Sequence, residues 1–240
     1  MNTGYNNIKW KDPRLGRYIP ANFDHVEKHP FMLDAVTKPV PVTVGINWYS
    51  DFDKPVKDKQ GMWWVGKDKN NLGTLRGGHC ICMPHNDSDT VNWYKYYDQG
   101  SQGACVGYGS SRMMTLLNRT MYQPRWLWDE AKKIDEWEET NPGDNNGTSV
   151  KAAMDVLRVQ GHKLRGKENI VLDAGISANR WATNVDDLFS VLQNKNYKQR
   201  GAIPFHNSWG NSYPRKVWMP CETWQLLMDQ QGEFTMVTDK

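Results

Sequence analysis

Two residues of the chain, Cys105 and His79, are of the types that carry out acyl transfer together. Cys105 follows the glycine-rich turn DQGSQGA and precedes the segment CVGYGSSRMMTLLNR, which has the apolar pattern of a helix. A thiol becomes a useful nucleophile at neutral pH when a helix N-terminus or a nearby imidazolium lowers its pKa. His79 lies in the short predicted strand RGGHCICM and could provide that imidazole. The pair predicts a thiol nucleophile with a histidine as its base.

Taken singly, each residue favours a structural interpretation. A lone cysteine is most often an inert buried side chain, and a strand histidine is most often structural. The glycines before Cys105, among them Gly103, favour the functional interpretation instead. Glycine lets backbone N–H groups come close to a substrate carbonyl, as an oxyanion hole requires. We therefore expect Gly103 to lie against the substrate.

Three motifs of the chain resemble those of the papain-like cysteine peptidases. DQGSQGAC resembles the D-Q-G-x-x-G-x-C pattern that carries the nucleophile of that family, and GGHCIC resembles its histidine strand. HNSWGNSYP resembles the N-S-W-G element, whose asparagine orients the histidine. The resemblance covers about residues 39–232 and is strongest to papain-like proteins of tailed phages, through stretches such as DPRLGR, GTSV, GINWY and GGH.

The resemblance implies a catalytic role for four residues. Cys105 would be the nucleophile, and His79 would be its base and later the general acid. Asn207 would accept a hydrogen bond from the second ring nitrogen of His79 and fix its tautomer. Gln99 would form the oxyanion hole together with the backbone N–H of Cys105.

The resemblance also implies substrate-side roles, and the sequence departs from the family in two places. Trp209 would shield the Asn–His hydrogen bond from water, and Gly147 matches, loosely, a glycine whose backbone pairs with the substrate. The family usually has a tryptophan after the nucleophile, where this chain has Val106. It also has a cysteine three residues before the nucleophile, where Gln102 stands here, so that disulfide is not expected.

The order of the motifs is a larger departure. The family has cysteine, histidine and asparagine in that order, whereas this chain has His79 first, then Cys105, then Asn207. The strand pair PVTVGINWYS and RGGHCICM therefore reads as a segment transposed toward the N-terminus. A triad is defined by geometry rather than chain order. We expect 76–83 to pair with 201–207, which would bring His79 and Asn207 together.

The element order predicts an α+β fold, and the resemblance specifies a papain-like fold of two subdomains with permuted segments. One subdomain would be helical and carry Cys105, and the other would be a sheet or barrel that carries His79 and Asn207. We divide the chain into an arm, a β segment with the histidine, a helical subdomain with the cysteine and a closing segment, all in one domain: 1–38, 39–90, 91–170 and 171–240.

Periodicity places the individual elements. Alternating valines and isoleucine predict a strand within KPVPVTVGINWYS, and the Gly- and Lys-rich segment 53–73 after it is predicted to be a loop. PRWLWDEAKKIDEWEE suits a helix that begins near Pro124. TSVKAAMDVLRVQG is a predicted helix with Thr148 or Ser149 as its cap, and NVDDLFSVLQN another, with Asn184 as its cap. GAIPFHNSWG reads as a strand that ends in a turn.

Composition argues against several functional classes. The chain has 30 basic and 27 acidic residues, and no extended Lys/Arg run indicates a nucleic-acid partner. No segment has the apolar character of a secretory signal or a membrane span. We expect a peptide or protein substrate, no cofactor, no metal and no membrane. The resemblance adds phage virion proteins as partners, with the protein in the host cytoplasm or in the virion.

Two other functions remain open. The chain could be a non-catalytic structural or interaction protein of a phage particle on a papain-like scaffold. Cys80, Cys82 and His85 could instead hold a metal ion, although further ligands are not clustered as in common zinc patterns. The thiol-dependent hydrolase remains the favoured interpretation.

Overall fold

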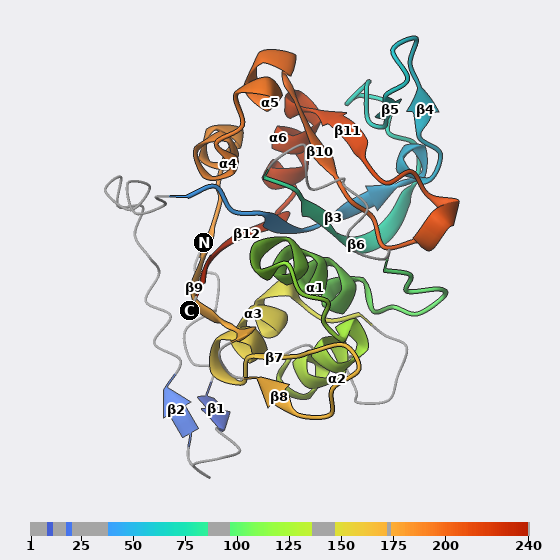
Figure 1. Ribbon diagram of the computed structural model, residues 1–240. Helices are drawn as coiled ribbons and strands as arrows, with labels where there is room; N and C mark the ends of the chain where they lie inside the picture. Colours follow the sequence, from blue (N-terminus) through green and yellow to red (C-terminus); the bar gives the residue numbers. More distant parts are fainter. Residues whose placement is uncertain are drawn as a thin grey trace.

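The computed structural model describes residues 9–11, 18–20, 38–85, 97–135, 147–171 and 174–239. Helices and sheets are both present, so the predicted α+β class is confirmed (Figure 1). Most of the predicted arm 1–38 lies outside the described residues. Its described part is a short antiparallel pair, β1 (Lys9–Lys11) and β2 (Tyr18–Pro20).

The main sheet contains four antiparallel strands in the order β6-β3-β12-β9. Its two central strands, β3 and β12, are largely buried, which explains their runs of valine, isoleucine, phenylalanine and methionine. β3 pairs with β6 along its length, with Ile46 opposite His79. The bounds are Val42–Tyr49 for β3, Leu75–Met83 for β6, Ile176–Trp181 for β9 and Glu233–Asp239 for β12.

A second four-stranded sheet has the order β10-β11-β5-β4. The prediction of a loop over 53–73 is wrong in part, because this segment contains the two-residue strands β4 and β5. Trp63 and Trp64 form β5 by pairing in parallel with Val217 and Trp218 of β11, a contact between distant segments. The bounds are Val56–Lys57 for β4, Trp63–Trp64 for β5, Ala202–Phe205 for β10 and Val217–Pro220 for β11.

The four predicted helices are present. The Ser149 hydroxyl caps α3 by accepting a hydrogen bond from the Ala152 N–H at 3.1 Å, and Asn184 caps α4 through the Asp187 N–H at 2.9 Å. The predicted end of the helix at 124–139 falls partly outside the described residues, and its described part ends at Ile134. The bounds are Cys105–Asn118 for α1, Pro124–Ile134 for α2, Val150–Val159 for α3 and Val185–Leu192 for α4.

Several elements carried no clear sequence signal. Helix α5 lies between α4 and β10, and α6 leads into β12. Two further short strands pair with one another, and two 3₁₀ turns follow strands. The bounds are Lys195–Arg200 for α5, Cys221–Asp229 for α6, His162–Lys163 for β7, Ile170–Val171 for β8, Ser50–Asp53 for η2 and Gly210–Ser212 for η5.

Strand β6 lies between two hydrophobic cores. Ile81 and Met83 join the core formed with the second sheet, α4 and α6, which we call the sheet core. Cys80 and Cys82 point to the opposite face and join the core formed with α1, α2 and α3, which we call the helix core. Figure 1 shows α1, α2 and α3 on one side of the main sheet and the second sheet with α4, α5 and α6 on the other. Because side chains alternate along a strand, β6 contacts both the sheet core and the helix core.

The predicted pairing of 76–83 with 201–207 is present as one antiparallel bridge. The Cys82 N–H donates to the His206 carbonyl at 3.2 Å, and the His206 N–H donates to the Cys82 carbonyl at 2.8 Å. The bridge ties the end of β10 to β6 and brings the next residue, Asn207, toward His79. Across the part of the chain that the structure describes, every helix is too short or too polar to span a membrane.

Candidate active site

His79 and Asn207 are joined by a hydrogen bond. The distance from His79 Nε2 to Asn207 Oδ1 is 2.9 Å, and both residues are buried. Asn207 Oδ1 also accepts a hydrogen bond from the Ser208 N–H at 2.7 Å, which identifies this atom as the carbonyl oxygen of the amide. Nε2 of His79 must therefore be the donor, and Nδ1 of the neutral ring carries no proton. The arrangement fixes the tautomer in which Nδ1 can accept a proton.

Two tryptophans pack against the imidazole of His79. Trp48 of β3 meets it edge-on at 4.6 Å between ring centroids, and Trp209 lies tilted against it at 5.2 Å. Burial lowers the pKa of His79 to about 4, although the hydrogen bond to Asn207 and the charge of Asp53 act in the opposite direction. The ring is therefore neutral at pH 7 and can act as a base.

Cys105 is the first residue of α1, where the backbone N–H groups have no partner within the helix. Its thiolate form would accept hydrogen bonds from the backbone N–H groups of Cys80, Val106 and Cys105 itself. Cys80 directly follows His79 in β6, so the sulfur lies against the backbone of the histidine strand. One helical turn on, a Cβ at Gly109 would stand 2.7 Å from the Cys80 sulfur, so only glycine allows α1 to approach β6 this closely.

The resting state pairs a neutral thiol with a neutral imidazole. Burial raises the pKa of the Cys105 thiol, and the backbone N–H groups offset only part of that effect. In the described part of the chain no hydrogen bond joins this thiol to His79. Nδ1 of His79 has no hydrogen-bond partner there and is accessible to solvent. Catalytic hydrogen bonds are often long without substrate, so a substrate would have to bring the two groups into contact.

The backbone of Gln99 lies beside the segment that contains Asn207, but its side chain points along its own loop. Its N–H donates to the Ser208 carbonyl at 2.9 Å, next to Asn207. Its Nε2 donates to the Gln102 carbonyl at 3.0 Å, and its buried Oε1 lacks a partner in the described part of the chain. One N–H of Nε2 remains for a substrate oxygen, because an amide nitrogen carries two hydrogens.

The three other predicted site residues do not all lie near His79 and Cys105. Trp209 packs against the ring of His79, and Gly103 lies half-buried in the turn before Cys105. Gly147 is exposed just before α3 and is not one of the residues that line the pocket at His79. The Cys-His-Asn residues and Gln99 thus lie around β6 and the start of α1, whereas Gly147 lies before α3 and outside the lining of the pocket at His79.

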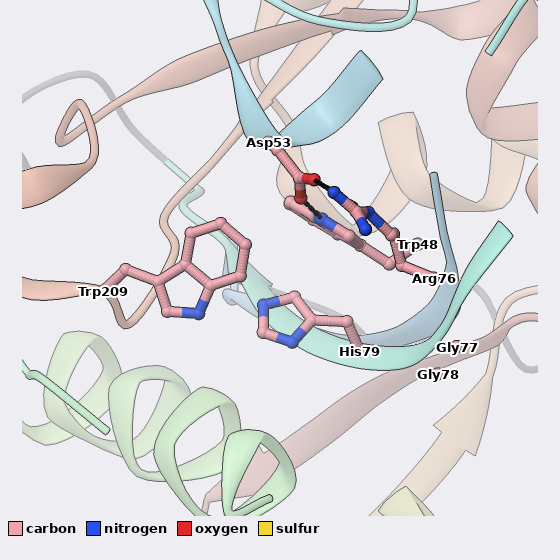
Figure 2. Close-up of a pocket in the computed structure, with 7 residues that line it drawn as sticks. All are labelled: Trp48, Asp53, Arg76, Gly77, Gly78, His79 and Trp209. Atoms are coloured by element: carbon pink, nitrogen blue, oxygen red, sulfur yellow. Dashed lines mark hydrogen bonds and ion pairs between the residues drawn. The ribbon is translucent and has the colours of Figure 1, made fainter. Parts of the chain in front are cut away.

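A pocket of about 300 Å³ opens beside His79, and sequence reasoning missed most of its lining. In Figure 2 the ring of His79 lies between Trp209 on one side and Trp48, Asp53 and Arg76 on the other. The alternating apolar residues of β3 could have indicated Trp48, because Trp48 points to the same face of the strand as Ile46. The pairing of Asp53 with Arg76 has no local signal, because the two residues lie in different elements.

The alternative metal site does not form. The described residues contain no group of three or more His, Cys, Asp or Glu side chains placed to hold an ion. Cys80 and Cys82 are instead buried in the helix core, and all four cysteines are free thiols. The conformation of Cys80 and Cys82 is explained by packing between β6 and α1.

Comparisons of the chain with protein-family models, with curated proteins and with solved structures gave no match. The function is therefore argued from the geometry of the site.

Proposed function

We propose that the protein is a cysteine peptidase-type hydrolase with a papain-like, permuted arrangement, in which Cys105, His79 and Asn207 form the catalytic triad. The observation that carries the proposal is the 2.9 Å hydrogen bond between His79 and Asn207. It joins two motifs that lie far apart in the chain and leaves Nδ1 of the histidine unprotonated. The position of Cys105 at the start of α1, against the strand of His79, supports the same proposal.

The chemistry follows from the protonation states. Nδ1 of His79 takes the proton of the Cys105 thiol as the sulfur attacks the substrate carbonyl carbon. The N–H groups at the start of α1 and the free N–H of the Gln99 side chain stabilise the oxyanion. When the C–N bond breaks, Nδ1–H gives its proton to the leaving amine and a thioester remains on Cys105. Nδ1 then takes a proton from water, whose oxygen attacks the thioester, and the proton finally returns to the sulfur.

The substrates that we propose are peptides or proteins. The resemblance to papain-like proteins of tailed phages adds a phage origin and virion proteins as candidate partners, with action in the host cytoplasm or in the virion. These parts of the proposal rest on the motifs alone.

A non-catalytic role on the same scaffold is the second candidate. The observation that favours it is burial, which raises the pKa of the Cys105 thiol and lowers that of His79. Both shifts disfavour the thiolate–imidazolium pair that usually activates a catalytic cysteine. A scaffold protein could keep the triad geometry without turnover.

Alkylation distinguishes the two candidates. At pH 6, iodoacetamide should label Cys105 in preference to the other thiols, because Nδ1 of His79 takes the thiol proton as the sulfur attacks the reagent. His79→Ala should abolish this preference because the base is lost. A Cys221→Ser variant is the matched control, since Cys221 is half-buried outside the site and its removal should leave the labelling of Cys105 unchanged. A peptide library should then be cleaved by the wild type and not by Cys105→Ser. A folded wild-type protein with neither selective labelling nor cleavage would establish the scaffold role.

A further inference from the structure

The pocket at His79 has aromatic walls and a charged rim. It is lined by seven residues from β3, η2, β6 and the asparagine segment (Figure 2): Trp48, Asp53, Arg76, Gly77, Gly78, His79 and Trp209. The rings of Trp48 and Trp209 meet at 5.4 Å between centroids. A group that enters the pocket would contact the indole surface of both tryptophans and the rim charges beyond them.

Hydrogen bonds already occupy the acidic residue of the rim. Asp53 Oδ1 accepts a hydrogen bond from Trp48 Nε1 at 2.8 Å. Asp53 Oδ2 accepts a hydrogen bond from Arg76 Nε at 3.0 Å and forms an ion pair with Arg76 Nη2 at 2.9 Å. The carboxylate is thus held by two hydrogen bonds and an ion pair, and it has little capacity left for a ligand.

Arg76 keeps free donors. Its Nη1 has no partner among the residues that the structure describes, and its side chain is 60% exposed. A guanidinium has five N–H groups, of which the pair with Asp53 uses two. The rim therefore offers donors rather than acceptors, and it suits a ligand that carries an acceptor, best of all a carboxylate.

The strand between Arg76 and His79 leaves room for that ligand. A Cβ placed on Gly77 or Gly78 would meet nothing within 4 Å, so each glycine borders open space. Gly77 also has a φ of 129°, which other residues rarely adopt. A side chain at either position would project into space that the two glycines keep empty.

We infer that this pocket receives the leaving group of the substrate and that Arg76 selects a leaving group with a carboxylate. The inference rests on the proposed function. His79 must donate its proton to the leaving amine, so the part of the substrate bound beside its ring is the part that departs. The indoles of Trp48 and Trp209 contact its apolar portion, and Arg76 pairs with its carboxylate.

Such a carboxylate has two sources. It is the α-carboxylate when the leaving group is the last residue of a chain, and it is a side-chain carboxylate when an acidic residue follows the cleaved bond. Both present the same chemistry to Arg76, and matched peptides separate them.

The test uses peptide pairs that share the acyl sequence cleaved best in the library. One pair ends one residue after the cleaved bond, as the free acid or as the amide. The other pair is longer and has Glu or Gln at that position. We expect the wild type to prefer the charged member of one pair by about fivefold in kcat/KM, since an exposed charged hydrogen bond is worth this much. Raising the salt concentration should reduce the preference.

Arg76→Gln should remove the preference, and Arg76→Lys should retain part of it. Lys69→Gln is the matched control, because Lys69 is also an exposed cation in an ion pair, with Glu222 at 3.5 Å, and it does not line the pocket. Equal kcat/KM within both pairs for a wild type that cleaves peptides would overturn the inference and leave the proposed function standing. A wild type that cleaves no peptide and shows no selective alkylation of Cys105 would overturn both.

Discussion

Two buried histidines, His79 and His162, have the same tautomer and lowered pKa values. They differ in whether the protein binds the ring nitrogen Nδ1. Nδ1 of His162 accepts a hydrogen bond from the Lys163 N–H at 2.8 Å, so its Nε2 donates to the Ser111 hydroxyl at 2.9 Å. The ring also stacks on Tyr122 at 4.5 Å between centroids. His162 thus has the same tautomer as His79, and burial lowers the pKa of His162 to about 3.

The difference lies in what remains available for chemistry. Both ring nitrogens of His162 are used by the protein, and the ring is enclosed in packing near the helix core. His79 uses only Nε2, and its ring lines a pocket that contains space for another molecule. A lowered pKa is therefore common to a structural and a candidate catalytic histidine. An unused Nδ1 beside a pocket is what separates them.

The largest expected effect is on activity. His79→Ala should lower kcat/KM by about 10⁴-fold, because it removes the base and acid of both half-reactions. His162→Gln should stay within about threefold of the wild type per folded molecule, since its ring does not line the pocket at His79. Peptide cleavage assays, corrected for the folded fraction by circular dichroism, make the measurement. Equal losses in the two variants would contradict the distinction.

Acid should destabilise the protein through both histidines. The pKa values of about 4 and about 3 in the folded protein lie below the 6.5 of the unfolded chain. The unfolded state then binds more protons between these values, so stability is complete above pH 6.5 and is lost as the pH falls toward 3. Protonation of His162 should lower the free energy of unfolding by about 5 kcal/mol. Urea unfolding at several pH values should show the difference between the wild type and His162→Gln shrinking as the pH falls; a constant difference would refute the lowered pKa.

The stability ranking at neutral pH should be the reverse of the activity ranking. His162→Ala should lower the free energy of unfolding by about 3 kcal/mol, because it leaves a cavity beside Tyr122 and orphans the partners of both nitrogens. His79→Ala should cost about 1 kcal/mol, since its ring already borders an open pocket. Urea unfolding at pH 7 measures both, and a larger loss for His79→Ala would mean that His79 is chiefly structural.

Asn207→Ala should lower activity less than His79→Ala does. It leaves His79 free to rotate and to change tautomer, and we expect kcat to fall by about 10²-fold with little change in KM. Ser111→Ala is the matched variant at His162, since it also removes the partner of Nε2, and it should leave kcat unchanged. Stopped assays at saturating peptide measure both. A loss confined to KM would assign Asn207 to substrate binding.

The sequence predicts the elements around the site better than the contacts between distant segments. Helices α3 and α4 carry their caps and apolar stripes within ten or so residues, and the predicted strand at His79 is present as β6. The pairing of β5 with β11 depends on segments distant in the chain, so the tryptophans of β5 read as part of a loop. The motifs led to the predicted proximity of His79 and Asn207, and the bridge at Cys82 and His206 is consistent with it.

The rim of the pocket could not be predicted for the same reason. Asp53 ends a 3₁₀ turn and Arg76 lies in β6, and only the folded sheet places their charges together. The engagement of the Gln99 side chain with the Gln102 carbonyl is also a property of the folded loop. Residue types thus indicated the candidate site residues, whereas the orientation of each group depended on tertiary contacts.

The most direct test of the account is nitrogen NMR of the His79 ring in the wild type and in Cys105→Ala. We predict a neutral ring at pH 7 with the proton on Nε2 and a pKa near 4 in both proteins, and an Nδ1 signal that differs between them once a peptide is bound. A proton on Nδ1, an ordinary pKa near 6.5, or an Nδ1 signal that stays the same in both proteins with a peptide bound would show that His79 and Cys105 do not form one site.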